Sequence, residues 1–206
     1  MTRWNDEDGL RWRALSPFGV EIDHDLAAPF SEAAADRFIA LFRQAGLIIA
    51  HGQALSLAEQ TALMTRVGPV LNRTGESGYI TTEHEHSSAR AEYTFHADAG
   101  YTAFPLEALS LHAVDVVDGA SSTRFAGADR GFATLPAALG ERLTAHAAEM
   151  ISPGHEMLAT RVSEIREPSA TWREERPTVL VNPRTGRRCI GVSEMHAARL
   201  IGMDWE

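Results

Sequence analysis

The middle of the chain reads Tyr93-Thr94-Phe95-His96-Ala97-Asp98-Ala99-Gly100-Tyr101. Side chains two positions apart on an extended segment point to the same side, so His96 and Asp98 can approach one metal ion together. Imidazole plus carboxylate is the ligand mix that suits a non-haem ferrous ion. A chain with nine histidines also contains such pairs by chance, as a surface histidine beside a solvated aspartate. The flanking sequence therefore has to decide between a metal site and a chance pair of surface residues.

Other segments accompany this pair along the chain. They are the apolar stretch 15–22, the stretches 46–50 and 55–60, the segment 118–123 and the stretch 176–188. Together with residues 93–101, their order and spacing resemble the taurine dioxygenase (TauD/TfdA-like) family over nearly the whole chain. The resemblance implies a double-stranded β-helix, a jelly-roll barrel with flanking helices that is incomplete at its C-terminus. The pattern of strands and helices alone indicates only an α+β protein.

The resemblance also implies a chemistry. Family members bind Fe(II) and use 2-oxoglutarate as cosubstrate, coupling its oxidative decarboxylation to the hydroxylation of a small organic substrate. His96 and Asp98 match two of the three metal ligands. Thr123 matches the threonine that binds the far carboxylate of 2-oxoglutarate, although Ala120 and the serines after it replace a glycine and an aspartate of the family's segment. Related halogenases replace the carboxylate ligand with a small residue, so Asp98 argues for hydroxylation.

One departure concerns the end of the sequence. The family's second metal histidine and its 2-oxoglutarate-binding arginine follow the region matched here, and no residue up to Glu206 corresponds to either. Three explanations remain: a fragment, a partner chain that supplies the rest, or a protein that does not catalyse. The alternative to the enzyme is accordingly a non-catalytic barrel subunit or pseudoenzyme that pairs with a partner chain, as a homo- or hetero-oligomer.

A further alternative is a cupin-like metal protein with an internal third ligand. His112 is the candidate on a neighbouring strand, although a hydrogen-bonded core or pocket-lining histidine is the simpler interpretation. His84 and His86 are interpreted as solvated loop residues, because flexible histidines rarely preserve an open metal site. For His155 and His196 the resemblance predicts no metal contact.

Composition limits the remaining classes. A chain of 206 residues with 44% hydrophobic content is predicted to form a single domain, residues 1–206. The net charge of -9 disfavours binding to nucleic acid or to an anionic membrane. The sequence has no lysine, which excludes a lysine nucleophile. A single cysteine, Cys189, permits no internal disulfide, and the polar amino terminus and lack of a membrane-length apolar stretch favour a cytoplasmic protein.

Local signals predict the elements of the first third. Ser31 is expected to cap an amphipathic helix that ends at Gly46, and residues 47–50 to form a buried strand. Ser56 and Glu59 form a capping box that begins a second helix. Residues 72–91 are polar and aperiodic, and are predicted to form a lid loop over the active site.

Later in the chain, residues 106–117 are predicted to be a core strand and residues 134–150 a helix. Residues 177–182 and 188–192 flank a Pro-Arg-Thr-Gly turn and are predicted to pair as a hairpin. Ser193 is expected to cap a short terminal helix that contains His196. Tyr93, Phe95 and Tyr101 flank the metal pair and either line a substrate pocket or belong to the core.

Overall fold

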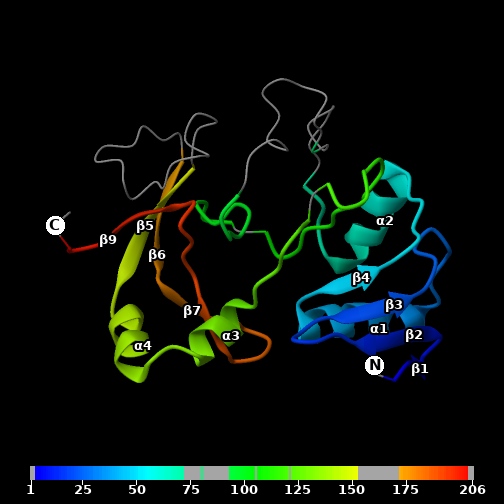
Figure 1. Ribbon diagram of the computed structural model, residues 1–206, viewed down its shortest axis with the longest axis horizontal. Helices are drawn as coiled ribbons and strands as arrows, with labels where there is room; N and C mark the ends of the chain where they lie inside the picture. Colours follow the sequence, from blue (N-terminus) through cyan, green and yellow to red (C-terminus); the bar gives the residue numbers. More distant parts are fainter. Residues whose placement is uncertain are drawn as a thin grey trace. The chain divides into compact units, whose positions relative to one another are not determined.

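The computed structural model describes residues 3–71, 80, 93–104, 106–120, 122–152 and 172–203. Its internal contacts divide the chain into two compact units (Figure 1). The first unit comprises Met1–Asn72 and Glu107–Thr123, and the second comprises Arg73–Leu106 and Arg124–Glu206. The expectation that residues 1–206 form one domain stays a prediction. The predicted lid at 72–91 falls, apart from Ile80, outside the described residues.

The first unit is built around a four-stranded sheet in the order β1-β2-β3-β4. The strands are β1 (Asn5–Glu7), β2 (Leu10–Ala14), β3 (Val20–Asp23) and β4 (Ile48–Ala50). β1, β2 and β3 pair in antiparallel fashion, whereas β4 lies parallel to β3. Helix α1 (Glu32–Ala45) connects β3 to β4 and packs against β2, β3 and β4 (Figure 1). A crossover helix is the usual way to join two parallel strands.

The two helices of this unit begin where the sequence predicts. The Ser31 hydroxyl accepts the backbone N–H of Ala34, and the N–H of Gly46 donates to the Phe42 carbonyl to end α1. In α2 (Leu57–Val67), the Ser56 hydroxyl accepts the N–H of Glu59 while the Glu59 carboxylate accepts the N–H of Ser56. Both caps satisfy N–H groups that the first helical turn leaves unpaired, which confirms these predictions.

Apolar side chains from the sheet and both helices form the core of the first unit. They recur at helical spacing on α1 and alternate along β3, which is the pattern of elements with one buried face. Fully burying each large apolar side chain contributes roughly 1.5–3 kcal/mol. The buried members are Leu10, Val20, Ile22, Ala34, Phe38, Leu41, Leu63 and Val67.

The second unit combines two short helices with two small sheets. The helices are α3 (Ala128–Ala133) and α4 (Ala137–Thr144). A three-stranded antiparallel sheet has the order β6-β5-β9, formed by β6 (Arg173–Pro177), β5 (Ala147–Ile151) and β9 (Ala197–Leu200) (Figure 1). Strands β7 (Val179–Val181) and β8 (Arg188–Ile190) form the antiparallel hairpin that the turn sequence predicts.

The predicted core strand at residues 106–117 is wrong. This segment forms no strand, and Leu109, Leu111, Val114 and Val116 are between 55% and 69% exposed. A strand forms only where a neighbouring segment pairs with its N–H and C=O groups, and the described part of the chain places no such partner beside these residues. Apolar periodicity identifies a face to bury but not the partner that buries it.

Two predicted helices are also corrected. Residues 134–150 form α4 only as far as Thr144, and the end of the segment is strand β5, because β6 and β9 pair with it on both sides. The expected terminal helix after Ser193 is a turn: the Ser193 carbonyl accepts the N–H groups of His196 and Ala197, and β9 begins at once. In both cases tertiary pairing overrides local helix propensity.

The described elements mix helices with antiparallel and mixed sheets, in agreement with the α+β expectation. Over the described ranges the strands form sheets of four, three and two members and do not close into a barrel. No helix in this part of the chain is both long enough and apolar enough to cross a bilayer.

Candidate metal centre

His96 and Asp98 lie in the second unit, on an irregular segment that ends in a tight turn. His96 has no regular secondary structure and Asp98 begins the turn, so the extended segment is not a regular strand. The N–H of Gly100 donates to the Ala97 carbonyl and that of Thr102 to the Ala99 carbonyl. The two side chains meet as their spacing predicts, with a nitrogen of His96 close to an oxygen of Asp98.

The His96 ring makes a hydrogen bond at each nitrogen. Nδ1 lies 2.8 Å from the Thr94 carbonyl oxygen, so it donates its proton there, and Nε2 lies 3.1 Å from Oδ1 of Asp98. The hydrogen bond to Asp98 is the main cause that raises the pKa of His96, partial burial opposes it, and the Thr94 carbonyl adds to it. Asp98 therefore favours the protonated form of the His96 ring, which can donate from both nitrogens.

The spacing of Nε2 and Oδ1 also fits a metal ion bound between them. Two neighbouring ligands at about 2.1 Å from an octahedral ion lie roughly 3.0 Å apart, which matches the spacing of Nε2 and Oδ1. An imidazole ligand commonly donates its other N–H to a backbone carbonyl, which fixes the tautomer, and Thr94 supplies that acceptor. Among the described residues, no group of three His, Cys, Asp or Glu side chains could hold a metal. This part of the chain thus offers two ligands.

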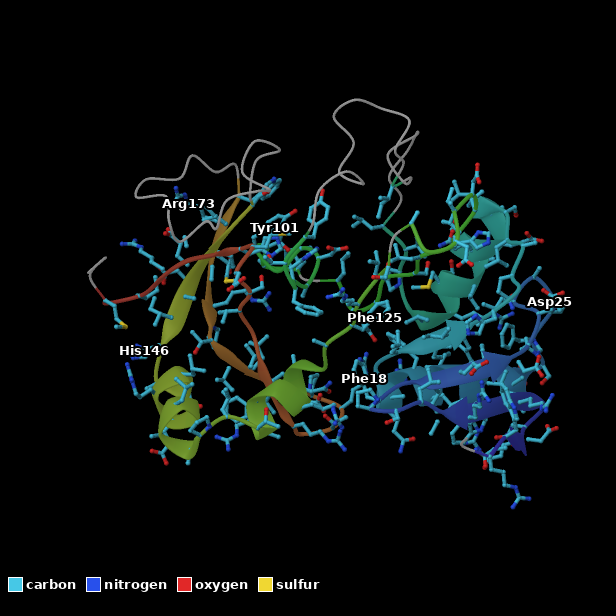
Figure 2. All side chains as sticks on the ribbon, in the orientation of Figure 1. Phe18, Asp25, Tyr101, Phe125, His146 and Arg173 are labelled. Carbon is cyan, nitrogen blue, oxygen red and sulfur yellow. The ribbon has the colours of Figure 1, made fainter. Side chains whose placement is uncertain are left out.

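A buried histidine that the sequence did not indicate stands next to the pair. His196 is 3% exposed, and its ring centroid lies 5.6 Å from that of His96 with the two planes perpendicular. Its ring is also 5.0 Å from that of Tyr101, which Figure 2 shows beside the start of β9. Burial, with a smaller contribution from the charge of His96, lowers the pKa of His196 to about 4. His196 is accordingly neutral at physiological pH.

Arg176 on β6 is a second residue that sequence reasoning missed. Its Nη1 donates to the Gly100 carbonyl over 3.0 Å and so links the sheet to the turn after Asp98. Arg176 and Gly100 are 76 positions apart, and His96 and His196 are 100 positions apart, so no local pattern connects them. Only a correct prediction of which strands pair could have indicated these contacts, because strand pairing brings distant residues together.

The aromatic residues beside the pair take different positions. Phe95 is 59% exposed, whereas the Tyr93 ring lies 6.1 Å from that of His96. The Tyr93 hydroxyl is buried and makes no hydrogen bond within the described structure. A buried hydroxyl without a partner is costly, so this one is available to a polar group of a bound molecule.

The remaining candidate residues belong to the first unit or lie outside the described residues. Thr123 belongs to the first unit, exposed and outside any helix or strand. His112 is in that unit too, and its Nε2 lies 3.3 Å from the Gln53 carbonyl, which agrees with the hydrogen-bonded interpretation. His84, His86 and His155 lie outside the described residues.

Comparison with known proteins identifies the family. The profile of the taurine catabolism dioxygenase TauD, TfdA family matches residues 11–205. The chain belongs to this family. Among curated proteins no significant match exists.

Solved structures share the fold at low identity. A provisionally assigned alpha-ketoglutarate dependent 2,4-D dioxygenase from Burkholderia xenovorans is 18% identical, with a TM-score of 0.67 over 95% of this chain and 73% of that chain. AAD-2, in complex with Mn(II) and N-oxalylglycine, is 15% identical with the same TM-score and coverage. A taurine dioxygenase from the same Burkholderia species is 16% identical, with a TM-score of 0.62 over 95% and 68% of the two chains. These likenesses establish the fold alone.

Proposed function

We propose that this chain is an iron(II)- and 2-oxoglutarate-dependent dioxygenase whose metal ligands include His96 and Asp98. The observation that carries the proposal is the 3.1 Å approach of Nε2 to Oδ1, with Nδ1 held by the Thr94 carbonyl. Family membership over residues 11–205 supports it. So does the neighbour that binds Mn(II) with N-oxalylglycine, since that molecule has two carboxylates and an oxo group arranged as in 2-oxoglutarate.

His96, Asp98 and Thr123 have different roles in this proposed reaction. His96 and Asp98 would hold the ferrous ion, which would supply the chemistry that couples oxidative decarboxylation of 2-oxoglutarate, to succinate and carbon dioxide, with oxidation of a substrate C–H bond by dioxygen. Nε2 of His96 would bind the metal without a proton, while the Thr94 carbonyl keeps Nδ1 protonated and the ring oriented. Asp98 contributes a negative oxygen. Thr123 is proposed to donate its hydroxyl to the far carboxylate of 2-oxoglutarate.

The substrate is proposed to be a small organic molecule bound beside this pair. The Tyr93 hydroxyl is buried near His96 and has no hydrogen-bond partner among the described residues, so it can hydrogen-bond to a polar group of such a molecule. The rings of the neutral His196 and of Tyr101 contact each other in the same region and add aromatic surface there.

The test is an anaerobic titration of the purified chain with Fe(II) and 2-oxoglutarate, followed by the weak visible charge-transfer band of a chelated iron complex. We expect a band in the wild type that Asp98→Ala and His96→Ala abolish. The matched control is His112→Ala, which should keep the band and would lose it only if the cupin-like alternative holds. A folded wild-type chain that gives no band would overturn the proposal.

A second function, a non-catalytic subunit that pairs with another chain, has one observation in its favour. Leu109, Leu111, Val114, Val116 and Val117 are large apolar side chains between 55% and 77% exposed, a density that soluble surfaces rarely show. Light scattering of the purified chain, combined with the iron titration, distinguishes the enzyme from the non-catalytic subunit. A complex that forms without any iron band would favour the subunit, whereas a monomer with the band would exclude it.

A further inference from the structure

The segment that carries the candidate ligands is held internally by short-range contacts. Residues 93–102 contain no helix or strand, and their described internal hydrogen bonds join His96 to Thr94 and Asp98, Gly100 to Ala97, and Thr102 to Ala99 through both its N–H and its hydroxyl. Because Thr94 and Asp98 belong to the same irregular segment, their bonds to His96 do not fix its ring relative to the sheet. A functional side chain needs to be restrained by packing and by hydrogen bonds from the residues around it.

His196 can restrain the His96 ring because its own backbone is fixed to the sheet. Its carbonyl accepts the N–H of Ile151 over 2.8 Å, and its own N–H donates to the Ser193 carbonyl, so its backbone is tied to β5. Its ring meets His96 at 5.6 Å and 90° and Tyr101 at 5.0 Å and 65°. Edge-to-face contacts of this kind favour one ring orientation over others.

Arg176 restrains the same turn from β6. Its guanidinium donates to the Gly100 carbonyl, and Gly100 is itself buried. A Cβ on Gly100 would lie 3.1 Å from the Ala97 carbonyl oxygen and 3.7 Å from Nδ1 of His196. The absence of a side chain there lets the turn approach both contacts closely.

We infer that His196 is a positioning residue, which holds the His96 imidazole so that Nε2 faces Asp98, while Arg176 anchors the turn behind it. The metal-binding part of this inference rests on the proposed function. His196 is not assigned as a ligand, because the described residues contain no three-member metal group although His196 lies among them. The His196 ring contacts the rings of His96 and Tyr101, and its Nδ1 lies 3.4 Å from the Ser193 hydroxyl. The contact with His96 is a ring contact, which an aromatic ring of any kind can make.

The test compares His196→Phe, which keeps a ring, with His196→Ala, which removes it. In the metal-free protein, imidazole ¹H–¹⁵N NMR reports the His96 Nδ1–H that donates to Thr94. We expect this signal in the wild type and in His196→Phe, and expect it broadened or lost in His196→Ala. With Mn(II) as the probe, His196→Phe should bind within about threefold of wild type. His196→Ala should bind on the order of 10–100-fold more weakly, the usual effect of removing a residue that orients a ligand.

His146→Ala is the matched control, because it removes a half-buried histidine of the same unit that Figure 2 shows well away from Tyr101. It should leave both readouts unchanged. If His196→Ala does not fold by circular dichroism, Arg176→Met replaces it, since this variant deletes the bond to Gly100 and leaves the buried residues intact. Arg176→Met should likewise weaken Mn(II) binding.

The outcomes separate the two hypotheses. Equal losses in His196→Phe and His196→Ala would show that the imidazole itself is required and would overturn the positioning role. Unchanged readouts in a folded His196→Ala would overturn it too, even if the wild type binds metal. A wild type that binds no Mn(II) but shows the expected NMR pattern in all variants would refute the proposed function and leave the positioning role intact.

Discussion

Oδ1 of Asp98 lies 3.1 Å from Nε2 of His96, within hydrogen-bonding distance. This contact raises the pKa of His96. Asp98→Asn removes the negative acceptor, and we expect the pKa of His96 to fall in the variant, measured by NMR titration of the apoprotein. An unchanged His96 titration would show that the contact does not form in solution.

The same contact gives metal-free stability a pH dependence. A raised folded-state pKa means that the folded protein binds a proton more tightly than the unfolded chain. The resulting stabilisation is complete below the unfolded value of about 6.5 and is lost as the pH rises through the raised value for His96. We therefore expect the difference in unfolding free energy between wild type and Asp98→Asn to shrink on going from pH 6 to alkaline pH. Urea denaturation at several pH values measures it, and a growing difference would contradict the assignment.

His196 predicts the opposite trend. Because burial lowers its pKa to about 4, the unfolded chain binds a proton between about pH 6.5 and 4 that the folded chain does not. Stability falls as the pH decreases through this window, by about 3 kcal/mol at pH 4. His196→Phe should remove this part of the acid loss in urea denaturation. Replacement of His51, whose side chain is 77% exposed, is the control and should keep the wild-type profile.

Thr178 is predicted to stabilise the junction of α4 with the second unit's sheet. It is fully buried, and its hydroxyl donates to the Leu143 carbonyl and lies 3.2 Å from the His146 carbonyl. Thr178→Val keeps the shape but removes the donor, and should cost about 1–3 kcal/mol in denaturant unfolding. Thr134→Val deletes an exposed hydroxyl bond to Gly131 and should change stability by less than about 0.5 kcal/mol. Equal effects would show that burial at Thr178 is not the cause.

Two glycines of the second unit should respond oppositely to alanine. At Gly191 a Cβ would meet Leu180 Cγ at 2.8 Å and the Pro177 carbonyl oxygen at 3.0 Å, so Gly191→Ala should destabilise by about 1–3 kcal/mol. At Gly140, inside α4, the nearest atom is Phe132 Cζ at 3.5 Å, an ordinary contact. Gly140→Ala should stabilise by about 0.5–1 kcal/mol, because glycine is a poor helix former. Thermal unfolding of both variants checks the signs.

Sequence patterns succeeded where the interaction is local. Ser31 and Ser56 cap the helices that they were predicted to cap, since a cap involves residues only three positions apart. The hairpin of β7 and β8 likewise follows from its turn. Residues 106–117 and 134–150 were misassigned, because the outcome there depended on whether a distant strand pairs with them.

The sequence by itself determined the capped helices and the pairing of His96 with Asp98, because both depend on residue types at short spacing. It also determined the family, through the order of segments along nearly the whole chain. Only the tertiary structure decided that His196 and Arg176 lie against that pair. Those contacts join residues 76 to 100 positions apart and exist only once β5, β6 and β9 have formed a sheet. Short-range hydrogen bonding and side-chain alternation can be read along a chain, whereas long-range packing depends on which segments meet after folding.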